Sequence, residues 1–166
     1  MAFTFVCTSD LLDKPILSAL TTTGDANAVH KTGYRVRASD GREFMYIKFD
    51  SSGVAAVAGA PAVFAQTTGT TDIVVTSDVS DGSLVACGAF LSILTDTYFG
   101  WIQTKGLLVG APVTGSNADT SAGDPVGATV DAMWSKITVG GTTNTGGTCP
   151  AASSGGYGNI DLLSLA

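Results

Sequence analysis

Residues 34–49 read Tyr34-Arg35-Val36-Arg37-Ala38-Ser39, then Asp40-Gly41, then Arg42-Glu43-Phe44-Met45-Tyr46-Ile47-Lys48-Phe49. An Asp-Gly pair between two alternating runs is the strongest local signal for a β-hairpin with a two-residue type I′ turn, because both turn positions need positive φ. Such a turn pairs Ser39 with Arg42, Arg37 with Phe44 and Arg35 with Tyr46. Since side chains alternate along a strand, the core face is predicted to carry Tyr34, Val36, Ala38, Met45, Ile47 and Phe49.

The opposite face of this hairpin is a candidate partner-binding surface. Five of the eight Lys and Arg residues fall within residues 31–48 of a chain whose net charge is −6. One interpretation is a solvated sheet face stabilised by arginine–aromatic pairs. The other is a docking face for an acidic protein surface, because concentrated charge sets orientation and association rate. The candidate residues are Arg35, Arg37, Arg42, Phe44, Tyr46 and Lys48, together with Leu162, Leu163 and Leu165 from the apolar C-terminal segment.

The composition of the 166 residues favours strands over helices. Thirteen of the 14 acidic residues are Asp, which favours turns, and Lys and Glu, which cover exposed helices, are scarce. No run of eighteen apolar residues predicts a membrane helix, and the acidic balance argues against a nucleic-acid partner. Short β-type runs separated by Gly, Asp, Ser and Thr predict an all-β fold, an antiparallel β-sandwich or a β-barrel-like domain with extended N- and C-terminal arms.

Three segments are expected along the chain. Residues 1–30 form an N-terminal arm, 31–139 a β-rich core domain, and 140–166 a Gly-rich linker with a C-terminal arm. The C-terminal arm is expected to dock on the same domain, on a neighbouring subunit or on a partner. Within the core, strands are expected in these ranges: two short ones in 54–65, then 72–76, 84–94, 98–109 and 126–139. The apolar run 84–94 also suits a short helix, but Gly88 and the β-branched residues favour a strand. A helical turn limited by Pro15 is expected within residues 9–20.

Reactive chemistry has little support in the sequence. The single histidine, His30, has no Gly-x-Ser-x-Gly partner motif, and no phosphate-binding loop occurs. Cys7, Cys87 and Cys149 are an odd, widely spaced set, which predicts free and mostly buried thiols. We therefore expect no catalytic residues, no metal and no cofactor.

Two acidic loops leave one alternative open. The loops with Asp78 and Asp81, and with Asp119 and Asp124, offer oxygen ligands for calcium, but neither has the ligand spacing of a known calcium loop. Turn formation by Asp side chains is the favoured interpretation.

Three features resemble the small virion structural proteins of tailed bacteriophages, particularly head decoration (cement) proteins. They are the Ala/Val/Gly-rich texture from Gly53 to Ala65, the strand Phe99-Gly100-Trp101-Ile102-Gln103-Thr104-Lys105-Gly106-Leu107, and the sequence Asp124-Pro125-Val126-Gly127-Ala128. The resemblance covers roughly residues 50–140. It implies a non-enzymatic, commonly trimeric β-module that sits at junctions between capsomers and stabilises the shell.

The expected function is therefore capsid decoration on the outer surface of the virion head. The expected partners are the major capsid protein and further copies of the chain, as a homotrimer, with no nucleic acid or membrane. Since no secretory signal is evident at the N-terminus, synthesis in the host cytoplasm is expected. Two alternatives stay open: a tail, tube or fibre component, and a carbohydrate-binding or hydrolytic β-module based on Trp101, Trp134 and the many Asp residues.

Overall fold

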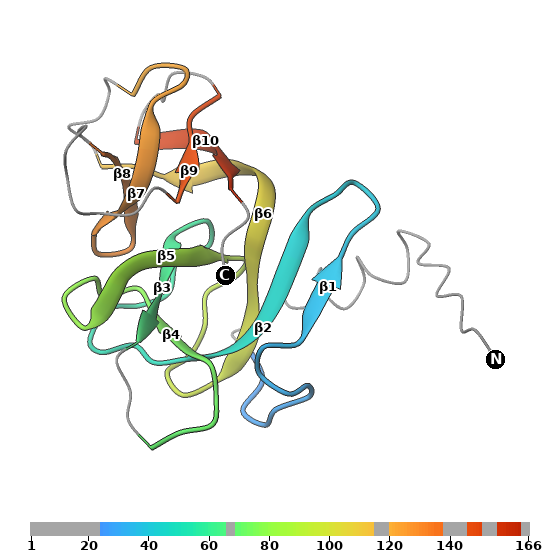
Figure 1. The fold of residues 1–166 in the computed structure, drawn as a ribbon. Coiled ribbons are helices and arrows are strands. Elements are labelled where there is room, and N and C mark those ends of the chain that lie inside the picture. Colours follow the sequence, from blue (N-terminus) through green and yellow to red (C-terminus); the bar gives the residue numbers. More distant parts are fainter. Residues whose placement is uncertain (1–23, 66–68, 115–119, 138–145, 151–155, 164–166) are drawn as a thin grey trace.

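A computed structural model gives the fold of residues 24–65, 69–114, 120–137, 146–150 and 156–163 (Figure 1). In these ranges the chain forms ten strands and no helix, so no helix of the described part could cross a membrane. The strands are β1 (Arg35–Arg37), β2 (Glu43–Phe49), β3 (Pro61–Ala65), β4 (Val74–Thr76), β5 (Gly82–Phe90), β6 (Phe99–Pro112), β7 (Pro125–Val130), β8 (Met133–Lys136), β9 (Gly147–Thr148) and β10 (Tyr157–Leu162). The predicted all-β, barrel-like fold class is confirmed.

Five strands close a small barrel. The order runs β2, β4, β3, β5 and β6, and β6 pairs again with β2. The β2–β4 pair is parallel and the other pairs are antiparallel. Large side chains that point inward fill the barrel, among them Met45, Ile47, Phe49, Phe90 and Ile102. Closure removes the free edges that an open sheet would leave on these five strands.

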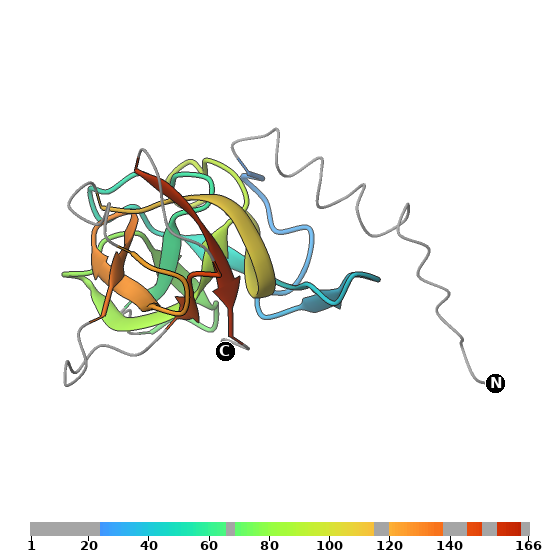
Figure 2. The same ribbon diagram turned by 90° about the horizontal axis from the view of Figure 1, so that it is seen from above.

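The C-terminal half of β6 belongs to a second sheet. Beyond Lys105, β6 pairs with β10, and β9, β7 and β8 follow. An isolated bridge from Val113 to Trp134 links the end of β6 to β8. Figures 1 and 2 show this sheet lying across the barrel. Its core includes Val63 of β3 and Ala86 of β5, so the second sheet packs against these barrel strands, in a cluster separate from the one that fills the barrel.

The hairpin of β1 and β2 forms as predicted, but its register is wrong by one residue. The structure pairs Arg35 with Met45, Val36 with Phe44 and Arg37 with Glu43. The loop has three residues, because the Ala38 N–H donates to the Arg42 carbonyl at 2.8 Å and the Gly41 N–H donates to the Ala38 carbonyl at 3.1 Å.

The turn geometry explains this shift. Gly41 has φ +88°, whereas Asp40 is not among the residues with positive φ. A type I turn followed by a left-handed glycine, the three-residue alternative to type I′, has this pattern. The Asp40 side chain stabilises it by accepting from the Arg42 N–H at 3.0 Å and from Arg42 Nε at 2.6 Å.

Both faces of β2 are buried, which corrects the predicted exposed surface. Phe44 and Tyr46 are each only 1% exposed, as is Met45 on the barrel side. The segment before β1 lies over the outer face of β2: the Val29 N–H donates to Tyr46 Oη at 3.1 Å. Conversely, Tyr34, predicted to be core, is 51% exposed. An alternating pattern identifies one buried face, but a second buried face appears only when distant segments cover it.

Several elements differ from the expectations in extent. Residues 126–139 were expected as one strand, but a two-residue turn at Asp131 and Ala132 divides them into β7 and β8. Residues 54–65 contain one strand, β3, because 54–60 are irregular with a turn at Ala58 and Gly59. The expected strand at 72–76 is β4, the one at 84–94 is β5, and the one at 98–109 is β6. The helical turn expected within 9–20 lies outside the described residues.

The C-terminal segment docks on its own domain. β10 lies between β6 and β9, with Ile160 and Leu162 in the core of the second sheet. The described parts of the expected linker and arm therefore belong to the same sheet as β7 and β8. Of the expected N-terminal arm, residues 24–30 are described, and Asp25 forms a backbone bridge with Phe99 on β6.

Candidate functional site

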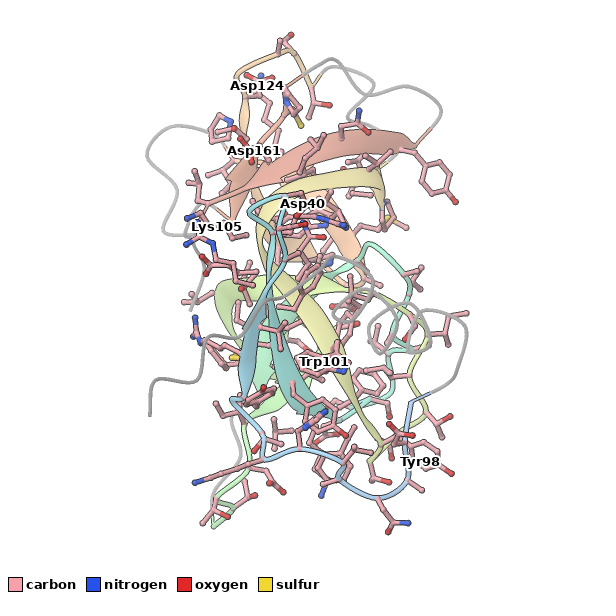
Figure 3. All side chains as sticks on the ribbon, turned by 90° about the vertical axis from the view of Figure 1, so that its right-hand side faces the viewer. Asp40, Tyr98, Trp101, Lys105, Asp124 and Asp161 are labelled. Atoms are coloured by element: carbon pink, nitrogen blue, oxygen red, sulfur yellow. The ribbon has the colours of Figure 1, made fainter. Side chains whose placement is uncertain are left out.

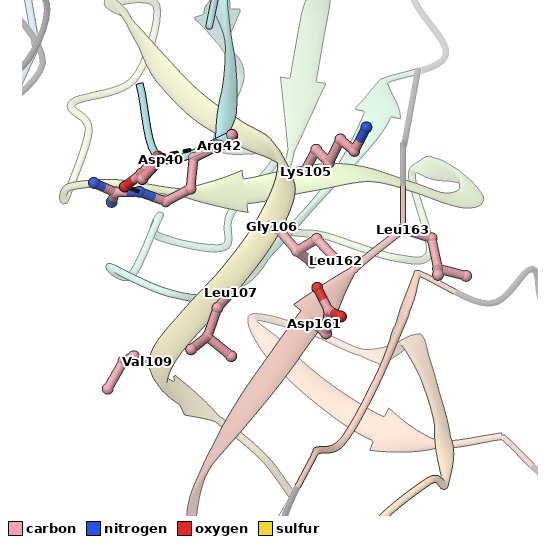
Figure 4. A pocket seen from close by; sticks show the side chains of 10 residues that line it. Asp40, Arg42, Lys105, Gly106, Leu107, Val109, Asp161, Leu162 and Leu163 are labelled. Atoms are coloured by element: carbon pink, nitrogen blue, oxygen red, sulfur yellow. Dashed lines mark hydrogen bonds and ion pairs between the residues drawn. The ribbon is translucent and has the colours of Figure 1, made fainter. Parts of the chain in front are cut away.

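A groove lies where β6 leaves the barrel and enters the second sheet. It has a volume of about 590 Å³ and runs between the β1–β2 turn and the paired strands β6 and β10 (Figure 4). Figure 3 shows Asp40, Lys105 and Asp161 near one another at this level, with Trp101 further along β6 on the barrel. The residues that line the groove are Asp40, Gly41, Arg42, Lys105, Gly106, Leu107, Val109, Asp161, Leu162 and Leu163.

The bend in β6 creates this groove. Pairing with β2 moves from Phe44–Gln103 to Glu43–Lys105, so that Thr104 is an extra residue in β6. Gly106 follows with φ +93°, and a Cβ there would lie 2.9 Å from Arg42 Cγ. A bulge of this kind bends the strand and increases its twist. Glycine at 106 therefore allows β6 to pass close beside the hairpin turn.

A buried amide secures the bend. Gln103 is 2% exposed, and its Nε2 donates to the carbonyl oxygens of Lys105, Gly106 and Leu107 at 3.2, 3.1 and 3.2 Å. These carbonyls lie along the bulged part of β6, where ladder pairing with β2 ends. Because buried backbone groups need partners, Gln103 stabilises an irregular backbone at the wall of the groove.

Apolar side chains stand exposed on the outer face of β6 and β10. Leu107 is 49% exposed, Val109 72% and Leu163 48%. Leu107 lies opposite Asp161 in the β6–β10 register, so both side chains point to the same face. We call Leu107, Val109 and Leu163 the apolar face. Exposed apolar groups that cluster beside charged groups are typical of interaction surfaces.

The charges around the groove balance. Arg42 and Lys105 supply two positive charges, and Asp40 and Asp161 supply two negative ones. Hydrogen bonds from the Arg42 N–H and guanidinium lower the pKa of Asp40. Glu43 lies 3.8 Å from Lys105 Nζ. Charges of both signs at the rim favour one orientation of a bound protein surface rather than strong attraction to a single sign.

The structure brings together only some of the predicted partner-binding residues. Arg42, Leu162 and Leu163 line the groove, although Leu162 is buried at its floor. Phe44 and Tyr46 belong to the core, and Leu165 lies outside the described residues.

The remaining basic residues of the hairpin lie elsewhere. Arg35 and Arg37 are exposed on β1. Lys48 Nζ lies 5.6 Å from the centroid of the Phe99 ring, and Arg42 Cζ lies 5.5 Å from that of Phe44. These two cation–aromatic contacts fit the interpretation of a stabilised sheet face.

Sequence reasoning missed Lys105, Leu107, Val109, Asp161 and Asp40 as members of one site. The signal available for β6 was Gly106 inside an alternating run, which is typical of a bulge. The pairing of β6 with β10, which places Asp161 opposite Leu107, joins two residues that are 54 positions apart in the sequence. Such a pairing leaves no local signal in either strand.

The tryptophans do not present platforms for a sugar. Trp101 is 5% exposed and Trp134 fully buried, and Trp134 Nε1 donates to the Gly59 carbonyl at 2.8 Å. His30 stacks on Tyr34 with ring centroids 5.1 Å apart, and its ring edge meets Trp101 at 5.5 Å. Both tryptophans are core residues.

The described acidic loops contain ordinary turn bonds. Asp78 Oδ1 accepts from the Ser80 N–H at 2.8 Å and from its hydroxyl, which lowers the pKa of Asp78. Asp124 Oδ2 accepts from Lys136 Nζ at 2.8 Å and from the Ser121 N–H at 2.7 Å, which lowers the pKa of Asp124. Asp119 lies outside the described residues. Among the residues that are described, no three His, Cys, Asp or Glu side chains gather closely enough to hold a metal ion.

Two of the three cysteines can be placed. Cys87 and Cys149 are free and buried, as predicted, and burial raises the pKa of both thiols. Cys7 lies outside the described residues. Comparisons with models of known protein families, with curated proteins and with solved structures found no match.

Proposed function

We propose that this chain is a non-enzymatic structural protein that decorates the head of a tailed bacteriophage and binds the major capsid protein through the apolar face. The observation that carries the proposal is the grouping of Leu107 and Val109 of β6 with Leu163, which directly follows the paired strand β10, beside a charged groove. The resemblance of residues 50–140 to head decoration proteins supplies the identity of the partner.

The physical properties of this face suit adhesion. The strands that carry it are held by a shared core, so binding requires little ordering of the backbone. Apolar side chains in the centre exclude water, while Arg42, Lys105 and Asp161 at the edge offer directed polar contacts. A trimer would present three such faces to capsomer junctions, and several modest contacts made together would give a high overall affinity.

The proposal is tested on heads of the phage whose genome encodes the chain. Purified protein is mixed with mature heads stripped of their outer proteins, and co-sedimentation is measured. We expect native protein to sediment with the heads, and Leu107→Asp/Val109→Asp to lose most binding while its unfolding curve stays unchanged. The matched control is Ile93→Asp, at a similarly exposed position on another part of the surface, which should bind as the native protein does.

Two results would contradict the proposal. Failure of native protein to sediment with heads would remove the capsid as partner. Assembly of the isolated protein into rings or tubes, seen by electron microscopy, would instead favour a tail, tube or fibre component.

A further inference from the structure

No strand among the residues that the structure describes pairs with the outer edge of β1. β1 is the terminal strand of the sheet order and pairs with β2. The hydrogen bonds from the Tyr46 N–H to the Tyr34 carbonyl and from the Ala38 N–H to the Arg42 carbonyl show that the Tyr34 carbonyl and the Ala38 N–H point toward β2. Because these directions alternate along an antiparallel strand, the N–H and C=O groups of Arg35 and Arg37 point outward, away from β2.

The side chains on this edge are basic and exposed. In a chain of net charge −6, Arg35 and Arg37 stand on the same face of β1, two residues apart. Arg37 Nε lies 3.9 Å from Glu43, and the Arg37 side chain is 68% exposed. Arg35 has no carboxylate within ion-pair distance among the residues that the structure describes. The edge thus combines unpaired backbone groups with incompletely neutralised positive charge.

The opposite face of the same edge is apolar. Val36 and Tyr34 share this face, Tyr34 is half exposed, and Val36 packs beside Phe44 and Trp101. A strand that paired with β1 would therefore meet arginines on one face and apolar groups on the other.

We propose that β1 accepts an extended segment of another protein as an additional antiparallel strand, and that this segment alternates acidic and apolar residues. Its residues opposite Arg35 and Arg37 would form the closely hydrogen-bonded pairs, and carboxylates at these positions would lie within reach of the guanidinium groups. The apolar residue between them would pack beside Val36.

Two other occupants fit the charge of the edge less well. A second copy of β1 in the register that sets Arg35 and Arg37 opposite one another would place like charges directly opposite, which is destabilising. The printed sequence has no two acidic residues at positions i and i+2 to match the two arginines. The charge pattern therefore favours a different protein as the partner. This edge is separate from the apolar face, so the inference does not depend on the proposed function.

The test is an NMR titration of the full ¹⁵N-labelled protein with a short capped peptide of alternating Val and Asp. We expect saturable shifts at the Arg35 and Arg37 amides. A peptide with Lys in place of Asp should not bind. The same Val/Asp peptide carrying N-methyl groups on its Asp amides keeps its charge but cannot donate to β1, and we expect it to lose binding as well.

Two variants of the protein test whether peptide binding depends on the positive charge of β1 or on positive charge anywhere on the surface. Arg35→Gln/Arg37→Gln is expected to bind the Val/Asp peptide about tenfold more weakly, because two exposed ion pairs are lost. The control Lys48→Gln/Lys136→Gln removes the same charge from β2 and β8 and should bind nearly as well as the native protein. The inference is overturned by an absence of saturable shifts, by equal binding of the N-methylated peptide, or by an equal loss in the control variant.

Discussion

The side chain of Gln103 offers the sharpest test of how this structure forms its groove. Its Nε2 is within hydrogen-bond distance of three carbonyl oxygens on the bulged part of β6. An amide nitrogen carries two hydrogens, so two full bonds are shared among the three acceptors. At about 1 kcal/mol net for each bond, Gln103→Leu is expected to lower the free energy of unfolding by about 2 kcal/mol.

Gln103→Glu should lower the free energy of unfolding by more than Gln103→Leu does. It keeps the size of the side chain but replaces the donor with a carboxylate that faces the same three carbonyl oxygens. The neighbouring Thr104→Val is the matched control, since Thr104 Oγ1 is buried and has no hydrogen-bond partner among the described residues. Removing that hydroxyl should leave stability unchanged within about 0.5 kcal/mol or raise it, because an unpaired buried polar group is unfavourable.

Urea unfolding of the four proteins measures these differences, with equal m-values as the sign that only stability has changed. Amide NMR shifts of Lys105 to Leu107 in the folded Gln103→Leu variant report whether the bulge moves. The reasoning is refuted if Gln103→Leu stays within about 0.5 kcal/mol of the native protein, or if Thr104→Val costs as much as Gln103→Leu.

Three further outcomes are expected. Gly41→Ala should lower the free energy of unfolding in urea by about 1 kcal/mol. The reason is backbone strain alone, because φ of Gly41 is +88° and an added Cβ meets no atom within 4 Å. Gly41→Asn should lower the free energy of unfolding less, and an equal loss in both variants would contradict this cause. Lys136→Met should raise the pKa of Asp124 toward about 3.9 in an NMR titration. Because the pKa of Asp124 is lower in the folded protein than in the unfolded one, the ion pair stabilises the native protein above the unfolded pKa. This stabilisation disappears as the pH falls through the folded pKa, so the native protein and the variant should become equally stable there. The thiol of Cys87, whose pKa is raised by burial, should resist iodoacetamide in the folded protein and react after unfolding. Peptide mass mapping locates the label. Rapid labelling of Cys87 in the native state would contradict this prediction and would show that the barrel opens readily.

Local pattern was sufficient for the class of fold and for many of its strands. The Asp-rich, Lys- and Glu-poor composition favoured strands over helices, and alternation identified β2 and β6. It also placed Met45, Ile47 and Phe49 in the core, where they lie. These features are local because backbone preference and side-chain period act over a few residues.

Local pattern predicted the hairpin but not its register or the burial of its second face. Asp-Gly suits both a two-residue and a three-residue loop, and the difference of one residue exchanges the cross-strand neighbours of Arg35 and Arg37. The bond from the Arg42 N–H to Asp40 stabilises the longer loop. Burial of Phe44 and Tyr46 then depends on residues 24–34 and on Trp101, which approach β2 from outside the hairpin.

The sequence by itself therefore determined that the chain forms strands, where many of them lie, and that Cys87 and Cys149 stay free. Tertiary structure alone decided that β2 is buried on both sides, that β10 enters the sheet beside β6, and that Leu107, Val109 and Leu163 meet at one groove. The physical reason is that a strand's alternation fixes which side chains share a face, whereas the partner that covers each face is chosen by contacts between residues far apart in the chain.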